Sequence, residues 1–155
     1  MKKINLCLLA LAFVIALSGT SAFAQTEKDD VFGYFFIKGR AVKAFTDIDH
    51  LNLAGSGEYG AQANPPFYGQ IRLKDKNKTD YKLLKPTQNG KNFSFTTETV
   101  NGVSYEFNGV LSRTDFSRDP QPSAGETVLT GTLKKKSGGK LAAQSKVSFR
   151  WELGD

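Results

Sequence analysis

The sequence predicts an all-β fold, an antiparallel up-and-down β-barrel of about eight strands. Two observations lead to this prediction. Apolar and polar residues alternate through several segments, and turn-forming dipeptides separate those segments. Because each such strand has one apolar face, the strands must bury those faces together. A two-sheet sandwich would also bury them and stays open as the alternative, but successive hairpins without a long crossover favour the barrel.

The clearest alternation lies in the second half of the chain. Residues 103–111 carry apolar side chains or glycine at odd positions and mostly polar side chains at even positions, and residues 93–98 alternate in the same way. Between them lies Asn101-Gly102, a dipeptide that tolerates positive φ at both positions and suits a type I′ turn. We therefore predict a β-hairpin over residues 91–113.

A second hairpin is predicted near the C-terminal end. Residues 141–153 alternate throughout, with mostly apolar odd positions and polar even positions. We expect a strand over residues 140–153 to pair with residues 126–136 across a glycine-containing turn at residues 137–139. Residues 114–125 contain two prolines and are predicted to form the loop between the two hairpins.

The first half of the chain has a less uniform pattern. Residues 31–38 are almost continuously apolar, which is typical of a buried strand. Residues 67–74 alternate, and residues 80–84 are their expected hairpin partner. Residues 40–54 are ambiguous, because their apolar positions fit one face of a helix as well as a strand. We favour a strand there and leave a helix open.

The first 24 residues are expected to be a cleavable signal peptide, followed by a single β-barrel domain at residues 25–155. Two lysines precede an apolar run at residues 6–17, which is shorter than the roughly 20 residues that span a bilayer. Ala22 and Ala24 supply the small residues that signal peptidase accepts, so cleavage is expected after Ala24. We therefore expect a bacterial protein that is periplasmic or secreted and has no membrane span after cleavage.

The composition excludes several kinds of chemistry. The only cysteine, Cys7, lies in the signal peptide, so the mature chain can have no disulfide, thiolate nucleophile or cysteine-based metal site. The only histidine is His50, no Gly-x-Ser-x-Gly motif precedes a serine, and no phosphate-binding glycine loop is present. We therefore expect no enzymatic activity and no cofactor.

His50 lies close to Asp47 and Asp49, and these three side chains are ligand types for a divalent metal. In a strand the two aspartates would share one face and His50 would point to the other. The three would converge only if the chain turned there. We favour a solvated turn, and no metal site is assigned.

Charged residues suggest two further surfaces. Arg113 and Arg118 at the start of the 114–125 loop have the guanidinium geometry that binds carboxylate or phosphate groups, although a locally paired loop explains them as well. Lysines cluster at residues 74–91 and 134–140, mainly at predicted strand ends and turns. They could form a patch for an anionic surface such as nucleic acid, lipopolysaccharide or an acidic glycan. We favour a role in solubility, because edge and turn lysines deter aggregation between sheets. Since an exported protein seldom meets nucleic acid, we expect no nucleic-acid partner.

Six aromatic residues should point into the barrel from adjacent strands. They are the candidate ligand-binding residues, because in a barrel of this size they form either a packed core or the wall of an apolar cavity. Gly109 and Gly131 also fall at the odd-numbered positions that should face inward. They would either open space or admit a large neighbour. The six are Phe93, Phe95, Tyr105, Phe107, Phe149 and Trp151.

The predicted strand count is similar to that of lipocalin and avidin barrels. The sequence lacks the Gly-x-Trp start of a lipocalin, because its only tryptophan is Trp151. The likeness therefore concerns architecture and says little about function. An eight-stranded outer-membrane barrel has the right size, but it usually ends on an aromatic residue, whereas this chain ends in Leu153-Gly154-Asp155.

Two functions remain open at this point. The first is an exported, non-catalytic barrel that binds a small apolar or amphipathic ligand in its interior. The alternative is a cell-envelope interaction module with a solid core that acts through its surface or through the 114–125 loop. The sequence identifies neither a protein partner nor an oligomeric state.

The export prediction can be tested by expressing the full chain in a bacterium. We expect the exported protein to begin at Gln25, because small residues at positions 22 and 24 define the cleavage site. Intact-mass spectrometry of the extracytoplasmic fraction measures this directly. Replacing Ala24 with the bulky, charged Arg should leave a longer, uncleaved chain; recovery of uncleaved wild-type chain in the cytoplasm would contradict the prediction.

Overall fold

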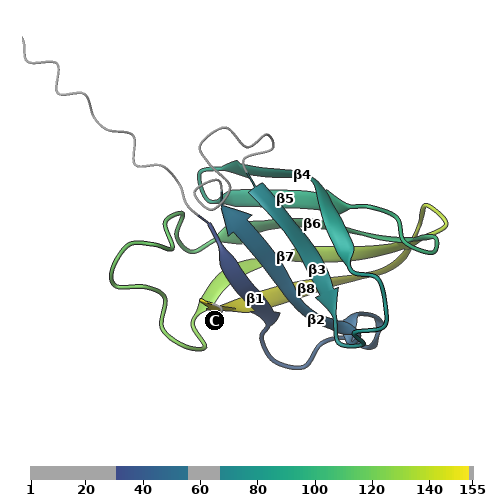
Figure 1. Ribbon diagram of the computed structural model, residues 1–155, viewed down its shortest axis with the longest axis horizontal. Helices are drawn as coiled ribbons and strands as arrows, with labels where there is room; N and C mark the ends of the chain where they lie inside the picture. Colours follow the sequence, from purple (N-terminus) through teal and green to yellow (C-terminus); the bar gives the residue numbers. More distant parts are fainter. Residues whose placement is uncertain (1–30, 56–66, 154–155) are drawn as a thin grey trace, which may run out of the picture.

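The computed structural model describes residues 31–55 and 67–153, and the predicted signal peptide lies outside them. The described chain is almost entirely antiparallel β, arranged as a closed barrel of eight strands in sequence order (Figure 1). The strands are β1 (Gly33–Ile37), β2 (Ile48–Gly55), β3 (Phe67–Leu73), β4 (Tyr81–Asn89), β5 (Asn92–Thr97), β6 (Val103–Leu111), β7 (Thr127–Ser137) and β8 (Lys140–Glu152).

Pairing between the first and last strands closes the barrel. β1 runs antiparallel to β8, with Tyr34 opposite Glu152 and Ile37 opposite Phe149. Each strand is therefore paired with both of its neighbours around the barrel, although β3 and β4 are paired only at Gln70–Lys82 and Ile71–Tyr81. The structure thus confirms the all-β class and the barrel rather than the sandwich.

Both hairpins of the second half are confirmed. Asn101 and Gly102 have φ of +50° and +76°, as a type I′ turn requires, and place Phe95 opposite Phe107 across β5 and β6. The second hairpin joins β7 to β8 through Gly138 and Gly139. The chain between β6 and β7, which includes residues 114–125, contains no strand or helix, as expected.

The first half differs from prediction in two places. The ambiguous segment 40–54 contains both kinds of structure, because a short 3₁₀ turn, η1 (Lys43–Phe45), precedes β2. The turn brings Phe45 into the core, where 1% of its surface is exposed. In addition, β4 extends well beyond the predicted end at residue 84. A register shift between Leu84 and Thr87 accommodates Pro86, which cannot donate a ladder hydrogen bond, and the strand then resumes.

No helix within residues 31–55 and 67–153 is long and apolar enough to cross a membrane.

Two facing glycines shape the middle of the barrel. Gly109 on β6 lies opposite Gly131 on β7, and the ring of Phe107 occupies the space over both. A Cβ atom at position 131 would lie 2.6 Å from Phe107 Cζ and 2.6 Å from Gly109 Cα. Real Cβ atoms do not approach that closely, so only glycine fits. The two inward glycines therefore admit a large neighbour and do not leave an opening.

We expect Gly131→Ala to destabilise the protein by about 3 kcal/mol, because the added methyl group must displace Phe107 or separate two paired strands. Urea unfolding followed by circular dichroism measures the change. The matched control is Thr130→Val on the outer face of the same strand, where the side chain is exposed and keeps its branched shape. Its effect should stay within about 0.5 kcal/mol. Equal stability of the two variants would show that the glycine is not sterically required.

Candidate functional site

The six aromatic residues predicted to face inward all lie inside the barrel. Their side chains are at most 4% exposed. Phe107 is at the centre: its ring stacks on Phe95 at 5.4 Å between centroids and meets the edge of Phe149 at 5.8 Å, with Phe93 at 6.4 Å. These four rings contact one another and form one packed cluster.

The other two candidates lie toward opposite ends of the barrel, and each meets a residue from a connecting segment. Tyr105 packs near Phe45 of η1, with ring centroids 6.4 Å apart. Trp151 packs against Phe116 of the β6–β7 loop, with centroids 5.8 Å apart. Phe116 is fully buried. Sequence reasoning missed Phe116 as a core residue, because a loop has no periodicity that reveals which side chain turns inward. Phe45 was one of the apolar positions in the segment 40–54, which the sequence left ambiguous between strand and helix.

A polar cluster surrounds the end of the barrel marked by Tyr105. Lys135 faces inward from β7 opposite Tyr105, and its Nζ lies 3.5 Å from Asp47 Oδ2 and 3.3 Å from the carbonyl oxygen of Ala44. The same ammonium lies 5.7 Å from the centre of the Tyr105 ring. Tyr81 meets Tyr105 edge to face at 4.8 Å. The cluster thus joins an ion pair to two phenol rings.

Two polar atoms of this cluster are buried without a hydrogen-bond partner, namely Asp47 Oδ1 and Tyr105 Oη. Burial raises the pKa of Tyr105, and the negative charge of Asp47 and the neighbouring Tyr81 raise it further. The pKa of Tyr81 is also raised, first by burial and then by Asp47. Both phenols therefore stay protonated well above neutral pH.

The three residues considered for a metal site do not converge. Asp47 lies in the turn before β2 and pairs with Lys135 toward the barrel end. Asp49 and His50 lie in β2, where Asp49 Oδ2 is 3.0 Å from His50 Nδ1. Across the described residues, no group of three or more histidine, cysteine, aspartate or glutamate side chains is arranged to hold a metal ion.

His50 belongs to an aromatic cluster on the outer face of the barrel. Its ring lies 4.9 Å from that of Tyr34 and 5.1 Å from that of Phe36. The guanidinium of Arg150 lies over the Phe36 ring, 4.5 Å from its centre, and forms an ion pair with Glu152. The guanidinium of Arg150 therefore already has partners within the chain.

The β6–β7 loop uses its arginines internally. The guanidinium of Arg113 donates hydrogen bonds to the backbone carbonyls of Asp115 (2.5 Å), Pro120 (2.6 Å) and Arg118 (3.1 Å). Arg118 pairs with the Asp115 carboxylate at 3.5 Å. The predicted alternative of a locally paired loop is what the structure shows for Arg113, which holds the loop closed over Phe116.

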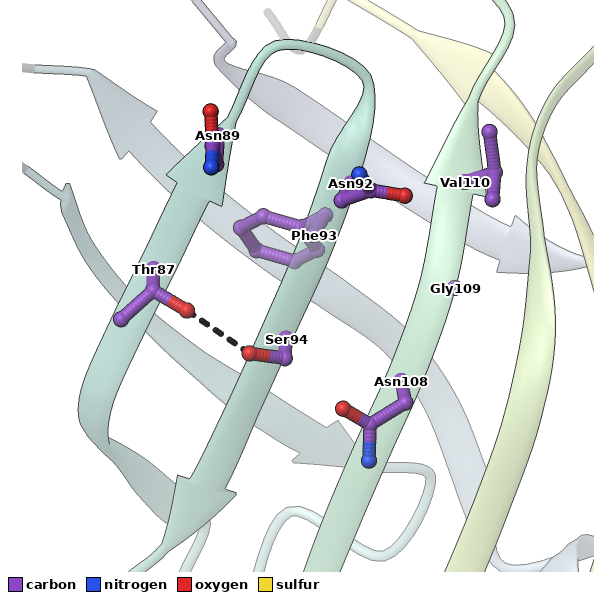
Figure 2. Close-up of a pocket in the computed structure, with 8 residues that line it drawn as sticks. All are labelled: Thr87, Asn89, Asn92, Phe93, Ser94, Asn108, Gly109 and Val110. Carbon is purple, nitrogen blue, oxygen red and sulfur yellow. Dashed lines mark hydrogen bonds between the residues drawn. The ribbon is translucent and has the colours of Figure 1, made fainter.

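A groove with a volume of about 470 Å³ lies on the outer face of β4, β5 and β6 (Figure 2). We call it the outer groove. Phe93 and Gly109, which face each other in the β5–β6 register, line its floor. Its remaining lining residues come from outward positions near the β4–β5 turn: Thr87, Asn89, Asn92, Ser94, Asn108 and Val110.

Sequence reasoning did not find the outer groove. The alternating pattern assigns Asn92, Ser94, Asn108 and Val110 to the polar face, but it does not show that this face is hollowed. The register shift in β4 further hides Thr87, because it changes which β4 residues face outward. The only available signal was that these outward positions are uncharged in a chain with 36 charged residues, 21 basic and 15 acidic.

Comparison with known protein families, with curated proteins and with solved structures found no match to this chain. The function is therefore argued from the residues and their geometry.

The buried phenols predict a loss of stability at high pH. The pKa of Tyr105 is raised above its ordinary value of 10.0, so the folded protein keeps a proton that the unfolded chain releases. Stability is unaffected by this group below pH 10 and should fall as the pH rises above it, with a limiting slope of about 1.4 kcal/mol per pH unit. Urea unfolding at pH 9, 10 and 11 (roughly spanning the ordinary pKa) measures the slope.

Tyr105→Phe should flatten that slope and should cost little at neutral pH, because the hydroxyl it removes has no hydrogen-bond partner. Tyr68→Phe, which removes a hydroxyl from a side chain that is 41% exposed, is the control and should leave the slope unchanged. The same slope in wild type and Tyr105→Phe would contradict the assignment.

Proposed function

We propose that this chain is an exported, non-catalytic binding module with a solid core, which acts through its outer surface. The observation that carries the proposal is the packing of the barrel interior. Phe107 contacts Phe93, Phe95 and Phe149, and its ring also fills the space over the two facing glycines. A ligand in the middle of the barrel would have to displace these rings.

The ends of the barrel support the same proposal. At one end Phe45 packs near Tyr105, and at the other Phe116 packs against Trp151 and Phe35. Entry of an apolar molecule would therefore require one of these segments to move as well. Burial of such large rings contributes roughly 1.5–3 kcal/mol each, which opposes that movement.

Two parts of the proposal rest on the sequence. Export rests on the pattern of residues 1–24, which has the features of a cleavable signal. Lack of catalysis rests on the composition of the mature chain, which has one histidine, no cysteine and no nucleophile motif.

We favour the outer surface of the barrel over the 114–125 loop as the surface that binds a partner or ligand. Phe116 of the loop is committed to the core, and the Arg113 guanidinium is committed to three backbone carbonyls. A loop held at both points has little freedom to close around a partner. Binding of a small apolar or amphipathic ligand inside the barrel stays a prediction from the sequence, and the packing counts against it.

The solid core can be tested with apolar probes. We expect the natively purified wild-type protein to show no saturable binding of benzene or of a fluorescent fatty acid, because the packed rings of Phe93, Phe95, Phe107 and Phe149 occupy the middle of the barrel. Leu133→Ala should create a buried apolar cavity that binds benzene, at a cost of about 2–5 kcal/mol in stability. Ligand-observed NMR and fluorescence titration measure the binding.

Thr132→Ala, next to Leu133 on the same strand but on the outer face, is the matched control and should bind no benzene. Stoichiometric binding of the fatty acid to wild-type protein would overturn the proposal. So would native mass spectrometry that finds an apolar molecule retained by protein taken from its own source.

A further inference from the structure

We infer that the outer groove binds a neutral, hydroxyl-rich ligand, namely a neutral glycan. The inference rests on the proposed function, since it needs the binding surface to lie outside the barrel, and it names the surface and the class of ligand. Three properties of the groove lead to it: unused hydrogen-bonding capacity, absence of charge among its lining residues, and the pairing of its central strand, β5, on both sides.

The groove carries three carboxamides without partners. No side-chain hydrogen bond is made by Asn89, Asn92 or Asn108 within residues 31–55 and 67–153. Figure 2 shows Asn92 extending from β5 toward β6 and Asn108 extending from β6 toward β5. Each carboxamide offers two donors and one acceptor, so the pair presents both kinds of group to the space between the strands.

The hydroxyl groups add to this capacity. Thr87 and Ser94 lie 2.7 Å apart and share one hydrogen bond across β4 and β5. Because each hydroxyl has one donor and two acceptor positions, the pair keeps unused positions that can face a ligand. Sugar hydroxyls are likewise donors and acceptors at once, so they match a lining of amides and hydroxyls.

The lining residues exclude an ionic ligand. None of the eight described residues that line the groove is charged. Binding of a phosphate, sulfate or carboxylate usually depends on arginine or lysine, and binding of a cationic group on a carboxylate. Basic and acidic residues do occur nearby on the same outer face, for example Lys82 and Glu106. Neither of these two residues lines the groove.

The pairing of β5 on both sides favours a glycan over a peptide in the middle of the groove. β5 is paired with β4 on one side and β6 on the other, so its backbone groups are not available to a peptide strand. The one apolar side chain at the rim, Val110, is 49% exposed and offers methyl groups to the carbon face of a sugar ring. The volume of about 470 Å³ lies within the roughly 300–1,000 Å³ range of ligand pockets.

A second groove lies on β7 and β8 and is smaller, about 300 Å³. It is lined in part by Lys146, whose ammonium would favour an anion, and it is therefore not included in the inferred site.

The inference can be tested by NMR, because the side-chain amides of asparagine give their own signals. We expect malto-oligosaccharides or N-acetylglucosamine oligosaccharides, used as neutral probes, to shift the side-chain signals of Asn92 and Asn108 in ¹⁵N-labelled, natively purified protein. Hyaluronan, an acidic glycan, should shift neither. Asn108→Ala should weaken binding of the neutral probe by about tenfold, the effect of one lost hydrogen bond.

The matched control is Asn52→Ala, which removes the same chemical group from the outer face of β2 and should leave the affinity unchanged. Asn92→Ala provides a second groove variant if Asn108→Ala folds poorly, with the same expected loss. Equal binding by the groove variants and wild type, or no shift with any neutral probe, would overturn the inference. So would a preference for hyaluronan or for an uncharged peptide at the same amides.

Failure here differs from failure of the proposed function. If no glycan binds but the interior excludes apolar probes, the solid-core module stands and only the ligand class is wrong. If an apolar probe shifts the interior signals of Phe95 and Phe107 in the wild-type protein, the proposed function itself is wrong.

Discussion

The contact between Phe107 and the facing glycines is the constraint on which the rest of the barrel depends. Without Cβ atoms at Gly109 and Gly131, the ring can lie directly over the paired backbones of β6 and β7. From there it reaches the rings of β5 and β8, so residues from four consecutive strands meet at one side chain. A bulkier residue at either glycine would separate the strands or expel the ring.

The same glycines relate the core to the surface. Glycine is one of the residues at which the strands of a barrel can kink and curve. The outer groove is lined in part by Gly109, and the smaller groove on β7 and β8 is lined in part by Gly131. Gly109 and Gly131 therefore take part both in the packing against the Phe107 ring and in the lining of the grooves.

Much of the fold could be predicted from the sequence, because its strands have the period of two that a one-sided burial requires. Asn101-Gly102 and Gly138-Gly139 fixed the hairpins, since few other residues adopt their positive φ values. The parts that escaped prediction lack such local signals. Pro86 interrupts β4 without ending it, and Phe45 and Phe116 enter the core from irregular segments, where burial is decided by distant neighbours.

The candidate site was less predictable than the fold for a related reason. Parity identifies inward aromatic residues equally well whether they surround a ligand or one another, and only their mutual distances separate the two cases. The alternating pattern also cannot distinguish an outward polar residue in solvent from one that lines a groove. What distinguishes Asn92 and Asn108 is that they belong to different strands, 16 positions apart in number (108 − 92), and become neighbours across a hollow only after β5 and β6 pair. A hydrogen-bonding surface of this kind is created by register, so it has no motif in the sequence, and its chemistry becomes visible only when the strands are assembled.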